Sequence, residues 1–210
     1  MTATAAPARP QNNDGTRARR WAQMITDGME PKNIITAVCA IIGSGRFGLP
    51  GLGWAAICVV FAAVLPVLFI HRVVKREGGG WAQRHLTEVQ LRIVVIPIIL
   101  LMVTAGLLLL VALHAPKAII AMQAAMLATL GAVYLITVWW TWKISGHTSV
   151  YAGAVAMAAV ELGPWWWLAL PLVVIIAWAR VTLREHTLAQ TVAGAALGVT
   201  VAGTVFALLN

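Results

Sequence analysis

Long apolar runs separated by short polar stretches set the pattern of this chain. Four runs approach the ~20 residues that a transmembrane helix needs, at 52–70, 93–113, 117–140 and 187–208. The run 148–179 is long enough for two short helices broken at Gly163–Pro164. Segment 33–49 contains Arg46 and a Gly-Ser-Gly interruption, so it either crosses as a short helix or folds back as a re-entrant element. The pattern predicts an all-α fold, an integral membrane helical bundle of six or seven transmembrane helices.

The first thirty residues differ from the rest because they are polar and basic, with arginines at Arg9, Arg17, Arg19 and Arg20. Such composition predicts a disordered basic tail over 1–30, followed by one transmembrane domain over 31–210. The first apolar stretch begins only near Ile34 and has no clear small-residue cleavage site after it. A signal peptide of the usual form is therefore not expected.

Composition supports the membrane interpretation and narrows the partners. Of 210 residues, 60% are hydrophobic and 10% charged, against roughly half and a quarter in soluble domains. We expect a multi-pass protein of the cell membrane, with the bilayer as partner. Lys and Arg exceed Asp and Glu by eight, but no basic surface alternates with exposed aromatics, so no nucleic acid is expected. Cys39 and Cys58 lie inside apolar runs and are interpreted as small buried hydrophobes.

The polar stretches 71–92, 141–147 and 180–186 are each separated by two predicted crossings, so they emerge on one face. They hold eight basic residues: Arg72, Lys75, Arg76, Arg84, Arg92, Lys143, Arg180 and Arg184. One interpretation is a topology signal for the cytoplasmic side. The other is that three loops converge on an anion, because charges beside a membrane are costly unless paired or used. If 33–49 crosses, the basic tail lies on the same side, which favours the cytoplasm.

Two histidines stand where helices are expected to begin. Ser145 is a natural N-cap, so Ser145, Gly146 and His147 would start a helix whose free N–H groups and dipole favour a phosphate. His186 also precedes a helix and follows Arg180 by six residues.

The two histidines, together with the basic residues near them, suit phosphoryl transfer from a lipid. Arg180 and Lys143 would neutralise phosphate oxygens. His186 would attack phosphorus and hold it as phosphohistidine, while His147 would protonate the leaving oxygen and later activate water. The scattered glutamates Glu88, Glu161 and Glu185 make a divalent metal site improbable, so neither metal nor cofactor is expected. Glu185 itself is interpreted as a partner of Arg184 or as solvated.

Ser145-Gly146-His147 together with Arg180-x5-His186 resembles two signatures of the type 2 phosphatidic acid phosphatase superfamily of membrane lipid phosphatases, over residues 117–208. The family pattern is Pro-Ser-Gly-His, then Ser-Arg-x5-His-x3-Asp. The resemblance implies a helical bundle with a phosphohistidine at His186 and an acid/base at His147. It also implies phosphate contacts from Ser145, Gly146 and Arg180.

The chain departs from that pattern at several positions. Ile144 replaces the Pro, Ala179 replaces the Ser, and Gln190 replaces the Asp that orients the nucleophile. An amide can orient His186 but supplies no charge, so a weakened nucleophile is expected. The first signature, Lys-x6-Arg-Pro, is absent. Its phosphate-binding role could pass to Lys143, or to Arg84, His85 and Arg92, which could equally be a topology-setting basic loop.

Three functions remain open at this stage. The first is a metal-independent phosphatase of isoprenoid (polyprenyl) or glycerolipid phosphates or diphosphates. The second is a prenyl diphosphate lyase or terpene cyclase on the same scaffold, and the third is a non-catalytic lipid-binding relative. The ten tryptophans, among them Trp139, Trp140, Trp142 and Trp178, bear on the second. They form either an aromatic belt at the membrane interfaces or an aromatic-walled cavity for a carbocation.

Overall fold

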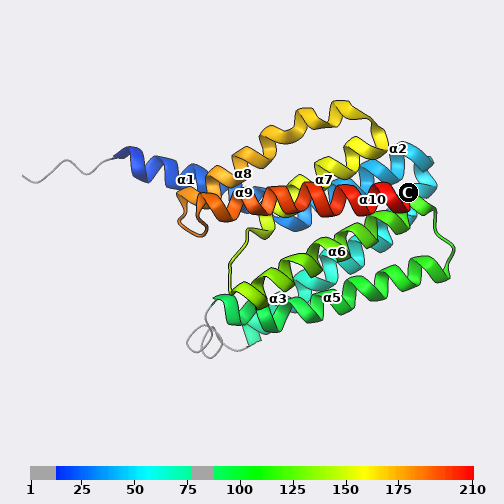
Figure 1. Cartoon of the computed structure of the whole chain (residues 1–210), viewed down its shortest axis with the longest axis horizontal. Coiled ribbons are helices and arrows are strands. Elements are labelled where there is room, and N and C mark those ends of the chain that lie inside the picture. The colour runs from blue at the N-terminus through cyan, green and yellow to red at the C-terminus, as the bar shows by residue number, and fades with distance from the viewer. Residues whose placement is uncertain (1–12, 77–87) are drawn as a thin grey trace, which may run out of the picture.

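The computed structural model describes residues 13–76 and 88–210, and every regular element in those residues is helical. The α-helices are α1 (Asn13–Gly28), α2 (Pro31–Val59), α3 (Leu65–Arg76), α5 (Glu88–Ala112), α6 (Lys117–Trp140), α7 (Gly146–Leu162), α8 (Leu170–Thr182), α9 (Leu188–Leu197) and α10 (Gly203–Leu209). Three short elements join some of them: the π-helical turns η1 (Val60–Val64) and η3 (Gly198–Ala202), and the 3₁₀ helix η2 (Pro164–Ala169). The bundle is drawn in Figure 1.

Five helical stretches are long and apolar enough to cross a membrane: Pro31–Arg72, Val89–Ala112, Lys117–Trp140, Pro164–Thr182 and Leu188–Leu209. The chain is therefore an all-helical, multi-pass membrane protein. The six or seven crossings predicted from sequence are not confirmed. Two features account for the difference between five stretches and six or seven crossings. The first stretch is one kinked helical run, and α7 has only 17 residues.

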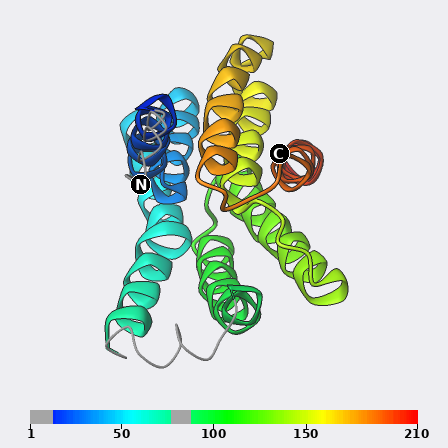
Figure 2. The ribbon, with the colours of Figure 1, turned by 90° about the vertical axis from the view of Figure 1, so that its left-hand side faces the viewer.

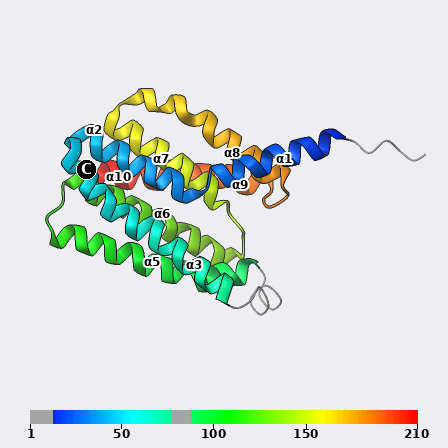
Figure 3. The ribbon, with the colours of Figure 1, turned by 180° about the vertical axis from the view of Figure 1, so that it is seen from behind.

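The first stretch folds back on itself at Gly48. This glycine has φ 61° and ψ −147°, a conformation that other residues rarely adopt. The two arms approach so closely that a Cβ on Gly51 would lie 2.0 Å from the Gly43 carbonyl oxygen. Figures 1 and 3 show the arm before Gly48 running to one end of the bundle and the arm after it returning toward α3. Residues 33–47 therefore form one arm of a helical hairpin, and whether this arm crosses the membrane or is re-entrant stays a prediction.

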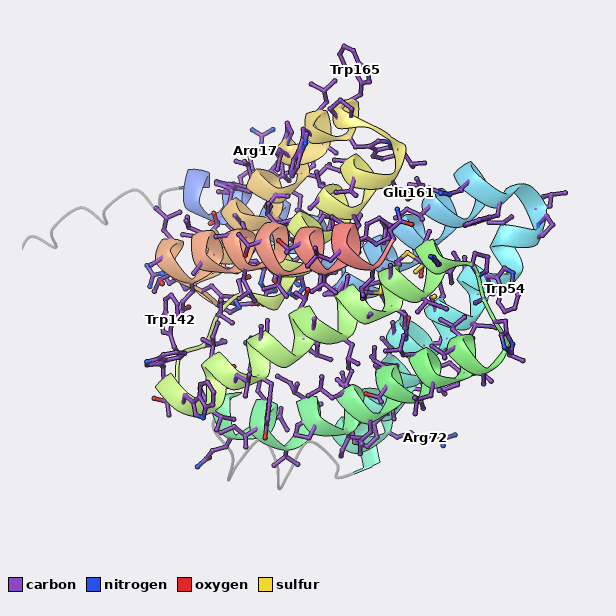
Figure 4. The ribbon with its side chains drawn as sticks, turned by 45° about the vertical axis from the view of Figure 1, so that its right-hand side comes forward. Arg17, Trp54, Arg72, Trp142, Glu161 and Trp165 are labelled. Carbon is purple, nitrogen blue, oxygen red and sulfur yellow. The ribbon has the colours of Figure 1, made fainter. Side chains whose placement is uncertain are left out.

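Helix α1 lies within the segment that the sequence predicted to be disordered, and residues 13–28 correct that prediction. Ala22 and Thr26 are buried, and Ile25 packs against the cluster around Ile176 of α8. This spacing of three and four residues places one stripe of α1 on its neighbour. The polar residues that suggested disorder lie on the opposite side of α1, which includes Arg17 and faces outward (Figure 4).

Helix α7 is the centre of the fold and packs against α2, α6, α8, α9 and η3. Nearly all its residues from Thr148 to Ala159 are buried, and most are small. Small side chains let helix backbones approach closely. At Gly198, for example, a Cβ would lie 2.1 Å from the Ser149 carbonyl oxygen. The start of α7 is therefore held firmly against the C-terminal helix.

The α6–α7 and α8–α9 connections meet at one end of the bundle, together with the C-terminal end of α3 and the start of α5. We call this the loop end; it lies at the left in Figure 1 and faces the viewer in Figure 2. The shared face predicted by counting crossings is confirmed for the described parts of the three stretches. At the opposite end, Arg46 pairs with Glu161 at 2.7 Å, and Asn210 Nδ2 donates to the same carboxylate at 2.6 Å (Figure 4).

Candidate active site

The two candidate histidines are positioned by helix starts, as the sequence predicts. Helix α6 ends with Thr141 in a left-handed conformation (φ 47°), and Ser145 caps α7 by accepting from the Thr148 N–H. Thr187 caps α9 in a capping box with Gln190, in which each side chain accepts from the other residue's backbone N–H. These caps fix where His147 and His186 leave their helices.

Hydrogen bonds join the two connections. The Ser145 N–H donates to the Gln190 carbonyl oxygen at 3.1 Å. His186 Nδ1 lies 3.1 Å from the Lys143 carbonyl oxygen and 3.2 Å from Gln190 Oε1. A residue 43 positions away along the chain thus helps to hold the His186 ring.

These contacts determine the tautomer of His186. A backbone carbonyl only accepts hydrogen bonds, and Gln190 Oε1 is also fixed as an acceptor by the Thr187 N–H at 3.0 Å. Nδ1 must therefore carry the proton, and Nε2 carries the lone pair. Nε2 is buried and has no hydrogen-bond partner among the residues that the structure describes, in a side chain that is 5% exposed. A buried unpartnered acceptor costs about 1–3 kcal/mol, which marks this nitrogen as a functional candidate.

Cationic side chains surround the two histidines. Arg92 Nη1 of α5 donates to the Ile144 carbonyl oxygen at 2.8 Å. Arg180, at the end of α8, pairs with Glu185 through Nη2, while its Nε is buried with no partner in residues 13–76 and 88–210. Arg92, Arg180 and Lys143 all lie close enough for their charges to disfavour protonation of His186.

Burial and this positive field keep both imidazoles neutral. Burial is the largest cause that lowers the pKa of His186 to about 4, followed by the charges of Arg92, Lys143 and Arg180. The pKa of His147 is lowered to about 3. Burial is again the largest cause, and the charges of Arg180, His186 and Arg92 come next. Burial also lowers the pKa of Lys143. Near neutral pH, then, the site combines neutral nitrogen bases with cations, a combination suited to an anionic ligand.

A cavity of about 380 Å³ begins at this cluster and extends into the bundle. Arg92, Arg180, Gly146 and His147 line its polar end, and a Cβ at Gly146 would meet nothing within 4 Å. The remaining wall is aliphatic, apart from Thr129, Ser149 and the Glu30–Lys32 pair (2.5 Å). His186 is not part of the lining.

The sequence-predicted site residues have these places. Lys143, Gly146, His147, Arg180, His186, Gln190 and Arg92 gather at the loop end. Ser145 is fully buried as the α7 cap and does not line the cavity. Arg84, with His85, lies outside the described residues, so its phosphate-binding role stays a prediction.

Sequence reasoning missed the role of Glu185. It was interpreted as a partner of Arg184 or as solvated, whereas it pairs with Arg180. The tight turn that ends α8 causes this, because the Glu185 and His186 N–H groups both donate to the Arg180 carbonyl oxygen, at 3.1 and 3.3 Å. The only signal in the sequence was the spacing of five residues between the arginine and the acid.

The tryptophans lie mostly outside the bundle. Trp165 is 80% exposed and Trp139 68%, and Figure 4 shows Trp142 and Trp165 projecting outward. Among the described residues, no tryptophan lines the cavity. This supports the aromatic-belt interpretation and contradicts the aromatic-walled cavity within the described part of the chain.

Within the described residues, no group of three or more His, Cys, Asp or Glu side chains is placed to hold a metal ion. In the comparisons with known proteins, no family model, curated protein or solved structure matches this chain. Its function must therefore be argued from the site itself.

Proposed function

We propose that this protein is a membrane-embedded, metal-independent phosphatase of lipid phosphates or diphosphates that works through a phosphohistidine on His186. The observation that carries the proposal is the state of His186. Its Nδ1–H is held by two oxygen acceptors, and its basic Nε2, which no described residue contacts by a hydrogen bond, lies in the field of Arg92, Arg180 and Lys143. A neutral nucleophile surrounded by cations is what attack on a phosphate anion requires.

The adjoining cavity supports a lipid as the substrate. A phosphate at Arg92 and Arg180 would leave the hydrocarbon part of the molecule facing the aliphatic wall. Apolar cavities with a few convergent polar groups are the usual form of small-molecule sites. The isoprenoid and glycerolipid classes expected from sequence both fit this description, whereas a cyclase mechanism loses support because no aromatic wall lines the described cavity.

In the first step, the lone pair on His186 Nε2 attacks phosphorus while the bond between phosphorus and the lipid-side oxygen breaks. The leaving oxygen takes a proton from His147. In the free protein His147 is neutral, because burial and the charges of Arg180 and Arg92 disfavour its cation. A phosphate dianion would offset those charges, so protonation of His147 would accompany substrate binding.

In the second step, His147 removes a proton from water, which attacks phosphorus and releases inorganic phosphate from Nε2. Lys143 O and Gln190 Oε1 stabilise the proton on Nδ1 throughout. Gln190 supplies no negative charge, so a modest rate is expected from this site.

Substrate must also open the site, because Nε2 is sealed and Arg180 is engaged with Glu185. A phosphate competes with the carboxylate for the same guanidinium and can bind it in a forked, bidentate manner. We infer that exchange of Glu185 for phosphate frees the approach to Nε2.

We further propose that the protein lies in the cell membrane with the loop end in the cytoplasm. Helix α1 lies at the loop end (Figure 1), where its Arg19 and Arg20 line one pocket together with Arg184. Basic residues next to transmembrane helices favour the cytoplasmic side. Cysteine labelling of intact cells at Arg184→Cys and Lys117→Cys tests this orientation, since Lys117 begins α6 at the opposite end.

The function is tested with the full chain purified in detergent. Phosphate release is measured from prenyl phosphates, prenyl diphosphates and phosphatidate, with EDTA present, and organic products are identified by gas chromatography. We expect prenyl alcohol or diacylglycerol with phosphate, and loss of at least a thousandfold in kcat for His186→Ala. A labelled phosphate should be trapped on the protein as an acid-labile, alkali-stable adduct.

His71→Ala is the matched control, because His71 is an exposed histidine of α3 outside the site. His147→Ala should lose activity on alkyl esters more than on an aryl phosphate, whose leaving group needs no proton. A folded protein that releases no phosphate from any of these lipids would refute the proposal. A hydrocarbon product would favour the lyase, and binding without turnover would favour a lipid-binding relative.

A further inference from the structure

The cavity has a measurable depth from its cationic end. On α7 its lining runs from His147 to Met157, and on α5 from Arg92 to Val103. At ~1.5 Å per helical residue, these stretches extend for about 15 Å. Both walls therefore give the same depth below the phosphate-binding groups.

The far end of the cavity is closed by tight packing. One turn beyond Val103, a Cβ on Gly106 would lie 2.5 Å from the Phe61 Cβ and 2.8 Å from Gln123 Nε2. Gln123 is fully buried, and its Nε2 donates to the Val103 carbonyl oxygen at 3.1 Å. Helices α5 and α6 and the turn η1 thus meet there without room for a chain to continue.

Depth and volume agree on the size of the occupant. An extended chain advances ~1.3 Å per bond, as the 3.8 Å between consecutive Cα atoms over three bonds shows, so ~15 Å takes about 12 carbons. The volume of 380 Å³ holds about 13 groups of ~30 Å³, the share of one water molecule in the liquid, which lies between all the carbons of two isoprene units and all those of three. Twelve main-chain carbons correspond to three isoprene units.

The geometry points to a single-chain prenyl phosphate or diphosphate of two to three isoprene units as the substrate class, with Ala154 and Met157 setting the length limit. This inference rests on the proposed function for the identity of the phosphate end. Small residues along the wall, Ala62, Ala63 and Gly153, leave space for the branch methyl groups of an isoprenoid. The pocket between α1 and the α8–α9 turn is lined mainly by polar and basic side chains such as Arg19, Arg20 and Arg184, so it offers no aliphatic wall to a second acyl chain.

The test uses prenyl phosphates of one to five isoprene units, together with a long polyprenyl phosphate and two-chain phosphatidate. We expect kcat/KM to peak at three units and to fall at least tenfold at five units and for phosphatidate. Equal kcat/KM for phosphatidate and the three-unit substrate would overturn the inference while leaving the proposed function intact.

Two variants test the length limit. Ala154 lies seven residues after His147, about 10 Å deep, so Ala154→Leu should move the optimum to two units. Met157→Ala should move it to four. The measured quantity is the ratio of kcat/KM for two lengths within each variant, so a loss of folded protein cancels. The controls are Ala105→Leu and Met102→Ala on α5, which do not line the cavity and should keep the wild-type ratio; unchanged ratios in both test variants would refute the assignment.

Binding is measured separately on His186→Ala, which lacks the proposed nucleophile, by thermal shift with the same lipids. If this variant prefers three units while the wild type hydrolyses nothing, the length limit stands and the proposed function fails. If it shows no preference among lengths, the length limit fails whatever the catalytic result.

Discussion

Gly194→Ala should disturb both stability and the site, because α9 crosses the start of α7 at this glycine. A Cβ there would lie 2.4 Å from the Ser145 carbonyl oxygen and 2.5 Å from Thr148 Oγ1. Ordinary contact needs a separation larger by about 1 Å, so a backbone must move, and overpacking of this kind costs about 1–3 kcal/mol. Alanine's higher helix propensity returns up to ~1 kcal/mol.

The control is Gly131→Ala on α6, where a Cβ would meet nothing within 4 Å. Gly131→Ala gains the same helix propensity but makes no clash. The difference in free energy of unfolding between the two variants is therefore the cost of overpacking. Unfolding of the full chain in mixed detergent micelles, followed by circular dichroism, measures both. We expect Gly194→Ala to be less stable than Gly131→Ala by about 1–3 kcal/mol.

The same displacement should reach the proposed active site. The Ser145 N–H to Gln190 O bond lies at this crossing, and Gln190 also holds His186. A misplacement of ~1 Å can cost about 100-fold in rate, so phosphate release by Gly194→Ala should fall 10- to 100-fold. Equal stability and equal activity of the two glycine variants would refute the reasoning from close packing.

Three other predictions concern the charges of the site. Gln190→Glu places a carboxylate beside His186 Nδ1, so the pKa of His186 should rise by about 1–3 units; the acidic limb of kcat/KM against pH measures this shift, and an unmoved limb would contradict it. Glu185→Gln removes the carboxylate that occupies Arg180, so KM should fall several-fold with little change in kcat; a higher KM would mean instead that Glu185 positions Arg180. Acid should destabilise the fold, because the pKa of His186 is about 4 in the folded protein against ~6.5 when unfolded. The unfolded chain binds more protons between these values, so this stabilisation is complete above pH ~6.5 and about 3 kcal/mol is lost as pH falls to ~4. Urea unfolding at several pH values measures the loss; His186→Asn should lose the share of His186 and keep that of His147, whose pKa is also lowered, to about 3.

Local signals in the sequence determined much of the fold. The apolar runs located the long helices, and Gly163–Pro164 marked the break at which α7 ends and η2 begins. Ser145 was predicted as an N-cap and is one, because capping depends on residues only three positions apart. The count of crossings also predicted correctly that the α6–α7 and α8–α9 connections lie at one end, because two successive helices that run the length of the bundle return the chain to the same end.

What remained undetermined depends on contacts between distant segments. Composition could not show that α1 packs on α8, nor that the arms of α2 fold together at Gly48. Helix lengths alone could not predict the cavity. Its depth is set by the close contact between Gly106 of α5 and Phe61, which are distant in the sequence. These features depend on packing at separations that no local pattern encodes.

The candidate site divides in the same way. The sequence by itself determined which side chains were available, with His147 and His186 at helix starts and basic residues in the connections. Only the tertiary structure decided that the Lys143 carbonyl and Gln190 would fix the tautomer of His186, and that Glu185 would occupy Arg180. The physical reason is that a hydrogen bond is made or lost within about half an ångström, and that precision comes from helices packed backbone to backbone.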